Sequence, residues 1–484
     1  MNLLEHIDTL AGSGILKRGN IRTDSRRVVK GDVFVAIKGT ARDGHDHINE
    51  AIGNGASLVV SGRAVPGVPG EKLMVVPDPV EALVEMARKV YEDPSALLKV
   101  YGVTGTNGKT TTVFLIDTIL THAGISCGFT STVFMKTSPG DMEVSNMTTP
   151  DVLAVNNALY RMKAGGMEAA AIEVSSHALS QRRIGGIGLD AAVFTNITPE
   201  HLDYHKDMDS YLRDKVKIFG YLKPGGLAAV NADDPMIAGY RPDLPAGCRL
   251  VRFGMGPDVD VSACNIEASM GGTEFDLNIR GAGRSRIRSR LIGGHNVYNM
   301  LSAVSALLDS GISPDVMGQA LEKARPVPGR LEAVDSAAPF RVFVDYAHTP
   351  NALENVLKCL RPLSGNRLIC VFGCGGDRDR TKRPVMGRIA SEMCDRIFIT
   401  SDNPRTEQPE AILEQIRKGV PGTGNYSIIG DRREAISNAL AFAAAGDIVL
   451  IAGKGHEDYQ IIGDTRLHFD DKEVAAGILM DLGY

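Results

Sequence analysis

The clearest chemical signal in the sequence is a glycine-rich run, Gly102 to Thr112 (GVTGTNGKTTT), which follows an apolar stretch. Glycines allow backbone N–H groups to face phosphate oxygens, and the N-terminus of a following helix adds a positive field. Lys109 can neutralise a terminal phosphate, and the Thr110 hydroxyl can reach Mg²⁺. Val103 stands where the strict GxxxxGK pattern has its first glycine. The run predicts a nucleotide-binding phosphate loop, and a glycine-rich turn with a solvated lysine is the alternative.

Two further segments place acidic and imidazole side chains directly after apolar runs. Glu173 ends one run and precedes VSSH, and the segment from Asn196 to His205 (NITPEHLDYH) follows another. Ligands bind at the carboxyl ends of strands in doubly wound sheets, so Glu173 could complete the shell of a Mg²⁺ ion. The second segment offers a metal ligand in the same way. Surface loop residues or helix caps are the alternative, but three strand ends in one domain favour a ligand site.

A sheet covered by helices must position these groups. The sequence of residues 94–328 has the pattern that such a sheet produces. Apolar runs alternate there with segments of helical periodicity such as Val113 to Leu120. This alternation is typical of a parallel sheet with helices on its faces. The runs are Leu98 to Thr104, Ala169 to Val174, Leu189 to Asn196 and Gly226 to Asn231.

Two more domains are predicted, one on each side of this segment. Residues 1–93 contain short alternating strands, clearest from Asp32 to Ile37, and end at a Glu-Asp-Pro linker. Beyond the RPVPG segment at 325–329, a second series of apolar runs indicates another doubly wound domain. Its runs are Arg341 to Val344, Arg367 to Phe372, Arg396 to Thr400 and Asp447 to Ala452. We therefore predict an α/β protein with a small α/β domain (1–93), a central P-loop domain with a mostly parallel sheet (94–328) and a Rossmann-like C-terminal domain (329–484).

Composition excludes several classes of protein. The 484 residues include 53 Lys and Arg against 58 Asp and Glu, so no basic excess favours nucleic acid. The most apolar stretch, Ala439 to Gly453, is interrupted by Asp447 and is shorter than the roughly 18 residues of a membrane span. The N-terminus lacks the basic-then-apolar order of a signal peptide. The seven cysteines form no CxxC pair, which disfavours disulfides and metal clusters. We expect a soluble, cytoplasmic protein whose partners are small molecules.

Taken together, the motifs resemble the Mur ligase family, ATP-dependent enzymes that add amino acids to the peptidoglycan precursor. In the central segment these are GTNGKT (105–110), EVSSH (173–177) and HLDYH (201–205). The resemblance extends over the whole chain, through TDSR (23–26), GDVFVA (31–36), DYAHTP (345–350) and GGDRD (375–379). DNPR (402–405) and GKGHE (453–457) resemble the members that add diaminopimelate as the third residue of the peptide stem.

The resemblance implies a reaction and its machinery. ATP would phosphorylate the D-Glu side-chain carboxylate of UDP-N-acetylmuramoyl-L-alanyl-D-glutamate, and the amine of meso-2,6-diaminopimelate would displace phosphate from the acyl phosphate. Mg²⁺ would offset the repulsion between the two anions. The implied catalytic residues are Lys109, Glu173, His201 and Lys215, and the implied metal-binding residues are Thr110, Glu173, His201 and Lys215. Lys215 is implied to carry CO₂ as a carbamate that steadies the metal, and a solvated helix lysine is the alternative.

The resemblance also implies three sets of binding residues. ATP would contact Gly105, Thr106, Asn107, Gly108, Lys109, Thr110, Thr111, Asn296, Asn299, Arg330 and Asp345. The UDP-linked dipeptide would contact Thr23, Ser25, Thr148, Thr149, Ser175, Gln181 and Arg183. Diaminopimelate would contact Arg378, Asp402, Asn403, Pro404, Arg405, Gly453 and Glu457. The guanidinium at 405 can pair with the second carboxylate of diaminopimelate, which lysine lacks, and a simple Asn-Pro turn is the alternative.

Other functions stay open on the sequence alone. The same ligation with L-lysine, a ligase of the folylpolyglutamate type, and a P-loop protein that only hydrolyses ATP would share the phosphate loop. Three positions depart from the family pattern, Cys374, Lys206 and Glu200, but none removes an implied ligand. We expect a monomer that acts in cell wall biogenesis and so in cell shape and division.

Overall fold

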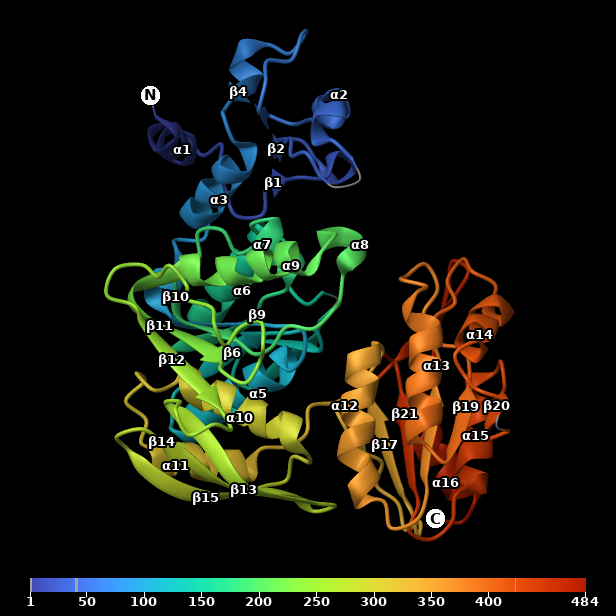
Figure 1. Cartoon of the computed structure of the whole chain (residues 1–484). Coiled ribbons are helices and arrows are strands. Elements are labelled where there is room, and N and C mark those ends of the chain that lie inside the picture. The colour runs from blue at the N-terminus through green and yellow to red at the C-terminus, as the bar shows by residue number, and fades with distance from the viewer. Residues whose placement is uncertain (1, 40–41, 146, 423) are drawn as a thin grey trace.

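A computed structural model describes residues 2–39, 42–145, 147–422 and 424–484. Within these ranges the strands form sheets of four, eleven, six and two strands. Figure 1 shows three bodies: the N-terminal one in blue, the central one from teal to yellow, and the C-terminal one in orange and red. The predicted α/β class is confirmed, and the domain boundaries at 93/94 and 328/329 stay predictions. In the described part of the chain, no helix has the length and apolar character needed to cross a membrane.

The N-terminal body is a small parallel sheet between helices. Its strands pair in the order β1-β2-β3-β4, and helices α1 and α3 pack with one cluster of apolar side chains while α2 packs with another. Asp78 caps α3 by accepting the N–H groups of Val80 and Glu81. The elements are β1 (Ile21–Arg22), β2 (Val33–Val35), β3 (Leu58–Ser61), β4 (Leu73–Val75), α1 (Leu3–Gly12), α2 (Ile48–Gly53) and α3 (Pro79–Val90).

The central sheet is parallel in its middle and antiparallel at both edges. Its order is β15-β14-β13-β12-β11-β10-β5-β9-β6-β7-β8. Four parallel strands match the predicted runs: β5 (Lys99–Thr104), β9 (Ala169–Glu173), β10 (Leu189–Phe194) and β11 (Leu222–Asn231). Two further parallel strands, β6 (Cys127–Thr130) and β12 (Arg249–Gly254), were not predicted. The edges are β7 (Phe134–Ser138) and β8 (Asp141–Val144) on one side, and β13 (Val261–Ser269), β14 (Gly272–Ile279) and β15 (Gly283–Ser289) on the other.

Helices cover both faces of this sheet. Apolar side chains of α5, α10 and α11 form one core against it, and those of α6, α7 and α9 form a second core on the opposite face. The helices are α4 (Pro94–Leu97), α5 (Lys109–His122), α6 (Val152–Ala164), α7 (Ser176–Ser180), α8 (Leu202–His205), α9 (Met208–Val216), α10 (Gly294–Ala306) and α11 (Pro314–Lys323). The predicted helix over 113–120 therefore begins four residues earlier, directly at the end of the phosphate loop.

The C-terminal body is a six-stranded sheet in the order β16-β17-β21-β18-β19-β20, parallel except for β16. Helices α12, α13 and α14 cover one face, and α15 and α16 cover the other. The strands are β16 (Glu332–Ala333), β17 (Arg341–Asp345), β18 (Leu368–Phe372), β19 (Arg396–Ile399), β20 (Tyr426–Ile428) and β21 (Ile448–Ala452), with a hairpin of β22 (Tyr459–Ile462) and β23 (Thr465–His468). The helices are α12 (Pro350–Leu360), α13 (Lys382–Met393), α14 (Pro409–Arg417), α15 (Arg432–Phe442) and α16 (Asp471–Asp481).

A buried ion pair ties the ends of two strands in this body together. The Arg432 guanidinium binds both carboxylate oxygens of Asp471 at 2.7 Å, and both side chains are fully buried. The same guanidinium donates to the carbonyl oxygens of Ser401, just after β19, and Ala452, at the end of β21. The pair therefore fixes the strand ends from which the 402–405 and 453–457 segments leave the sheet.

We predict that Arg432→Met lowers the free energy of unfolding by about 3–5 kcal/mol, because it leaves the Asp471 carboxylate buried without its partner. Urea unfolding followed by circular dichroism measures this. The matched control is Arg388→Met, which removes an exposed pair with Glu392 and should cost less than about 1 kcal/mol. Equal effects of the two substitutions on the free energy of unfolding would contradict a stabilising role for the buried pair.

Candidate active site

The phosphate loop between β5 and α5 depends on two glycines. Gly105 has a φ of +148°, and a Cβ there would lie 1.9 Å from the Thr195 hydroxyl oxygen. Gly108 has a φ of +86°, and a Cβ there would lie 2.2 Å from Oδ1 of Asn299. Helix α5 begins at Lys109 without a side-chain cap, so its first-turn N–H groups stay available to an anion. No other residue type fits the loop at 105 or 108.

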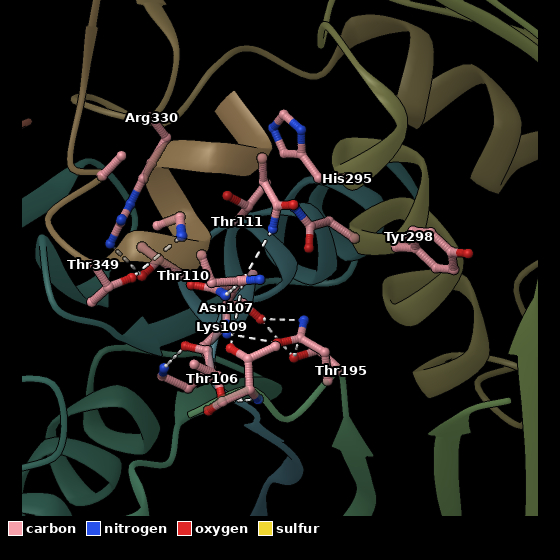
Figure 2. A pocket seen from close by; sticks show the side chains of 18 of the residues that line it. Thr106, Asn107, Lys109, Thr110, Thr111, Thr195, His295, Tyr298, Arg330 and Thr349 are labelled. Atoms are coloured by element: carbon pink, nitrogen blue, oxygen red, sulfur yellow. Dashed lines mark hydrogen bonds between the residues drawn. The ribbon is translucent and has the colours of Figure 1, made fainter. Parts of the chain in front are cut away.

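Residues at the end of β10 hold this loop in shape. The N–H groups of Thr106 and Asn107 donate to the backbone and side-chain oxygens of Asn196 at 2.8 and 2.9 Å. The Thr195 hydroxyl donates to the Asn107 carbonyl at 2.6 Å. The Lys109 ammonium lies over the loop and donates to the carbonyls of Gly105 and Thr106 at 3.1 and 2.8 Å. The protein itself thus fixes both the loop and the cation that a phosphate would meet (Figure 2).

Glu173, at the end of β9, lies buried beside the first turn of α5. Its carboxylate accepts the Thr110 hydroxyl at 3.0 Å, and it also accepts the N–H and the hydroxyl of Thr132 at 2.9 and 3.1 Å. Arg330 donates to the same Thr110 hydroxyl oxygen from the C-terminal body at 3.3 Å. A carboxylate and a hydroxyl in contact are hard oxygen donors of the kind Mg²⁺ prefers, so these two residues fit a magnesium site.

His201 and Glu200 follow β10 on the segment that leads to α8. His201 is the N-cap of α8 with a φ of +55°, and its ring nitrogen is 3.8 Å from the Glu200 carboxylate. Loss of water around the ring lowers the pKa of His201 despite that carboxylate, so the imidazole is neutral at pH 7 and able to bind a metal. Among the described residues no three His, Cys, Asp or Glu side chains gather closely enough to hold a metal ion. A magnesium ion here would therefore need further oxygens, such as those of phosphate.

Lys215, on α9, is fully buried behind the phosphate loop. Its ammonium donates to the Gly105 carbonyl at 2.6 Å and lies 4.6 Å from the centre of the Tyr211 ring. Within the described part of the chain it forms no ion pair with a carboxylate. Burial, and then the charge of Lys109, lower the pKa of Lys215 well below its usual value. Its burial contradicts the alternative interpretation of Lys215 as a solvated helix lysine.

A cavity of about 780 Å³ joins these groups to the C-terminal body. Figure 2 shows Lys109 and Thr110 in its centre, with Arg330 and Thr349 on one side and His295 and Tyr298 on another. The cavity brings together most of the residues predicted to bind ATP and metal, together with two of the dipeptide set: Thr106, Asn107, Gly108, Lys109, Thr110, Thr111, Asn296, Asn299, Arg330, Asp345, Glu173, His201, Thr148 and Ser175. Its size lies within the range of ordinary small-molecule sites.

Some lining residues were not predicted from the sequence. Asp233 and Asp234 follow β11 directly, and Asp233 accepts the Tyr298 hydroxyl at 2.8 Å. Like Glu173, they lie at the carboxyl end of a strand, so the same sequence pattern could have predicted them. His348 and Asn351 were also missed as single residues, and Asn351 accepts a hydrogen bond from the Asn107 side chain at 2.9 Å. That bond joins α12 to the phosphate loop.

Asp345 organises the edge of the cavity that the C-terminal body supplies. Its carboxylate accepts the N–H groups of Leu331 at 2.6 Å and Ala347 at 2.8 Å. Burial raises the pKa of Asp345. Arg330 stacks 4.6 Å from the centre of the Tyr346 ring, which holds the guanidinium toward Thr110. In this structure Asp345 shapes the backbone that carries Arg330.

The predicted dipeptide residues divide between two places. In the central body, Arg183 donates to the Thr149 carbonyl at 2.9 Å and to the Gln181 side chain at 2.8 Å, and the Ser175 N–H donates to the Thr149 hydroxyl at 3.0 Å. In the N-terminal body Thr23 is exposed, while the buried Ser25 donates to Glu50 at 2.6 Å. A substrate that contacts both groups must therefore be elongated.

The segments predicted to hold diaminopimelate converge at the carboxyl ends of β18, β19 and β21. Asn403 donates to the Glu457 carboxylate at 2.8 Å, and a Cβ on Gly453 would lie 2.9 Å from the Asp402 carboxylate. Burial raises the pKa of Glu457. Pro404 is buried within this group, whereas Arg378 is exposed at its edge.

Arg405 lies at the end of the DNPR segment with a left-handed backbone. It has a φ of +53°, and its backbone pairs with β22 through the Ile461 carbonyl at 3.1 Å. Its guanidinium donates to the Gly376 carbonyl at 2.8 Å. It has no carboxylate partner within the ranges that the structure describes. A half-buried guanidinium held at one nitrogen leaves its other donors free for a carboxylate ligand.

Comparisons with known proteins agree with this arrangement. The Mur ligase family, catalytic domain, matches residues 19–91, the Mur ligase middle domain matches 103–307, and the Mur ligase, glutamate ligase domain, matches 329–455. The chain is 42% identical, over 99% of both chains, to the UDP-N-acetylmuramoyl-L-alanyl-D-glutamate--2,6-diaminopimelate ligase of Syntrophomonas wolfei. It is 44% identical to the protein of the same name from Gloeobacter violaceus, over 94% of this chain and 92% of that one.

A solved structure extends the likeness to three dimensions. It is described as the structure of a UDP-N-acetylmuramoyl-L-alanyl-D-glutamate--2,6-diaminopimelate ligase, and it superimposes with a TM-score of 0.69 at 33% identity, covering 96% of this chain and 95% of that one. Family matches in all three bodies, full-length identity above 40% and the shared fold lead to one conclusion. The chain belongs to the Mur ligase family.

Proposed function

We propose that the chain is an ATP-dependent ligase that adds meso-2,6-diaminopimelate to the D-Glu side-chain carboxylate of UDP-N-acetylmuramoyl-L-alanyl-D-glutamate. The choice of amino acid rests on the Arg405 guanidinium. This group has no carboxylate partner in the described structure and lies among the ends of β18, β19 and β21. The second carboxylate of diaminopimelate matches a free guanidinium, and L-lysine has no group for it. The relatives named above carry the same activity in their names.

The chemistry follows from the charges around the cavity. The D-Glu carboxylate attacks the γ-phosphorus of ATP, ADP leaves, and the amine then displaces phosphate from the acyl phosphate. Lys109 and Arg330 approach the Thr110 side of the loop from two bodies, so they offset the charge of the triphosphate as a second anion approaches. Thr110, Glu173 and His201 would hold Mg²⁺, which supplies charge neutralisation at the phosphate oxygens.

We assign Lys215 as the site of a carbamate formed with CO₂. A buried lysine with no carboxylate partner in the described structure has an uncompensated charge, and a carbamate replaces that charge with an anion suited to a metal ion. The Gly105 carbonyl, which the ammonium now contacts, belongs to the phosphate loop. The modification would thus place its oxygens next to the nucleotide site.

The remaining assignments follow from the family. The N-terminal body, residues 1–93, binds the UDP end of the substrate through Thr23 and Ser25. The central body, 94–328, binds ATP and the dipeptide, and residues 329–484 bind the incoming amino acid. The protein acts as a monomer in the cytoplasm, in the synthesis of the peptidoglycan precursor, and so contributes to cell shape and division. Ligation of L-lysine and a folylpolyglutamate-type activity are the alternatives.

The first prediction concerns the dependence of phosphate release on substrates. With ATP and Mg²⁺, release should require both the UDP-linked dipeptide and meso-diaminopimelate, because the acyl phosphate forms only on the dipeptide and is discharged only by the amine. A coupled phosphate assay with each component omitted in turn tests this, and mass spectrometry of the product compares meso-diaminopimelate, LL-diaminopimelate and L-lysine. Steady ATP turnover without either substrate would favour a hydrolase instead.

The second prediction concerns Lys215. Lys215→Ala should lower ligation by about 100-fold or more, because an anion near the metal is lost. Added acetate should restore part of the activity by occupying the place of the carbamate. Lys217→Ala is the matched control, because Lys217 is exposed and pairs with Asp214. Full activity in Lys215→Ala, or a loss that no carboxylate restores, would refute the carbamate.

The third prediction concerns selectivity. Arg405→Ala should lower kcat/KM for meso-diaminopimelate by about 30- to 150-fold, corresponding to 2–3 kcal/mol for one charge-assisted pair. The value for L-lysine should change little, because lysine has no second carboxylate to pair with this guanidinium. Arg417→Ala, on the exposed face of α14, is the control. An unchanged preference between the two amino acids would contradict the role of Arg405 in selectivity.

A further inference from the structure

His348 lies directly after β17, where the C-terminal body meets the phosphate loop. It lines the cavity, and the next residue, Thr349, caps α12 and appears beside Arg330 in Figure 2. In the first turn of α12, Asn351 bonds to Asn107 of the loop. The imidazole is therefore held at the wall between the ATP groups and the loops of the C-terminal body.

The tautomer of His348 follows from one contact. Nδ1 is 2.8 Å from the Tyr346 carbonyl oxygen, and a carbonyl only accepts, so Nδ1 carries the proton. Nε2 then presents a lone pair. Within the described residues no donor is bonded to Nε2. A neutral imidazole with one nitrogen fixed and the other free in a cavity is equipped to accept a proton.

Charges on both sides of the ring define its surroundings. Burial lowers the pKa of His348 to about 4, with further lowering from Lys382 and Arg330, and the Glu200 carboxylate acts in the opposite direction. Lys382 donates to the His348 carbonyl at 2.8 Å, and the Tyr346 ring packs with its centre 4.5 Å away. The imidazole is thus uncharged and only weakly basic at pH 7 before substrates arrive, and the negative charge of the bound acyl phosphate would raise its basicity.

The same ring lies within electrostatic reach of both halves of the proposed reaction. Glu200 belongs to the central body and lines the cavity beside His201, and its carboxylate and His348 influence each other. On the other side His348 influences the carboxyl group of Asp402, at the start of the DNPR segment, and the ring of His456. The imidazole lies between the place where the acyl phosphate forms and the place where the amino acid binds.

We propose that Nε2 of His348 is the base that deprotonates the attacking amine. This rests on the ligase function proposed above. The amino acid arrives as an ammonium, which has no lone pair and cannot attack. Nε2 takes one proton, the free amine attacks the acyl carbon, the C–N bond forms and the C–O bond to phosphate breaks. The departing phosphate takes the second proton from nitrogen and leaves as HPO₄²⁻, so the reaction releases one proton in total, from the imidazolium to water.

Two neighbouring groups are less suited to this role. Glu457 already accepts from Asn403 at 2.8 Å and from Lys454 at 3.4 Å, which directs it to hold a charge within the amino acid site. His456 packs 5.1 Å from the Tyr346 ring but is not among the residues that line the cavity, and its Nδ1 is buried without a partner in the described structure. His348 combines a free nitrogen with access to the cavity.

The test separates the two half-reactions. His348→Gln should lower the rate of diaminopimelate ligation by about 10²- to 10⁴-fold. Formation of the acyl phosphate, trapped with hydroxylamine in the absence of diaminopimelate, should stay within about threefold of wild type, because hydroxylamine is unprotonated at neutral pH and needs no base. His468→Gln, an exposed histidine on the same body that pairs only with Glu473, should leave both reactions unchanged.

The pH dependence of kcat distinguishes a base from a residue that only supports the structure. Wild-type kcat at saturating diaminopimelate should be flat from pH 6 to 8, because His348 is neutral throughout. In His348→Gln it should rise about tenfold per pH unit, because only the free amine reacts. Imidazole should restore activity to His348→Ala.

Two results would overturn the proposal, and a third would refute the ligase function on which it rests. Ligation by His348→Gln at the wild-type rate with a flat pH profile would overturn it, as would equal losses in hydroxylamine trapping and ligation. Absence of dipeptide-dependent trapping in the wild-type protein would instead refute the ligase function itself.

Discussion

The site depends on the contact between the phosphate loop and the end of β10. At Gly105 the backbone approaches Thr195 so closely that a single added carbon atom would overlap its hydroxyl. Asn196 then holds the next two backbone N–H groups, and Lys215 supports the Gly105 carbonyl from behind. The loop is therefore shaped before nucleotide arrives, which removes the cost of ordering it on binding. Asn351 contacts this loop, and Glu173 and Arg330 contact the first turn of the helix that follows it.

Charge balance explains the distribution of the remaining side chains. Lys109 and Arg330 lie beside the loop, while Glu173 and Asp345 are buried close by. Each buried carboxylate is satisfied by hydrogen bonds from hydroxyl or backbone N–H groups rather than by a direct ion pair. The cations consequently keep their charge available for ligands. Two anionic substrates can meet in such a cavity because the protein has not neutralised its own positive groups.

Much of the architecture could be predicted from the sequence. Four strands of the C-terminal body, β17, β18, β19 and β21, lie within one residue of the predicted runs, because buried parallel strands are continuously apolar and end at glycine or polar residues. The antiparallel edges of the central sheet were missed. Strands such as β14 alternate buried and half-buried residues and carry charges on the exposed side, so they lack that continuous signal. Helix α5 was predicted to begin too late, because Lys109 to Thr112 are polar residues that the fold buries or half-buries.

The candidate site was predictable where a residue follows a strand within a compact motif, as for Glu173 and the phosphate loop. It was not predictable where a group acts through tertiary contacts. Nothing in the sequence indicates that Glu200 and His348, almost 150 positions apart, influence each other, or that Asn351 reaches Asn107. The role of Asp345 is likewise visible only once its carboxylate is seen to hold Leu331 and Ala347.

The segment from Gly329 to Asn351 connects the two halves of the proposed chemistry. Arg330 reaches Thr110 on the nucleotide side, and Asp345 ties the backbone after Arg330 to the end of β17. The following residues turn toward the amino acid site, where the Tyr346 ring contacts His456 and Lys382 donates to His348. The Asp345 carboxylate therefore holds both the residue that follows Arg330 and the residue that precedes His348, so one short stretch of chain forms the wall of both sites.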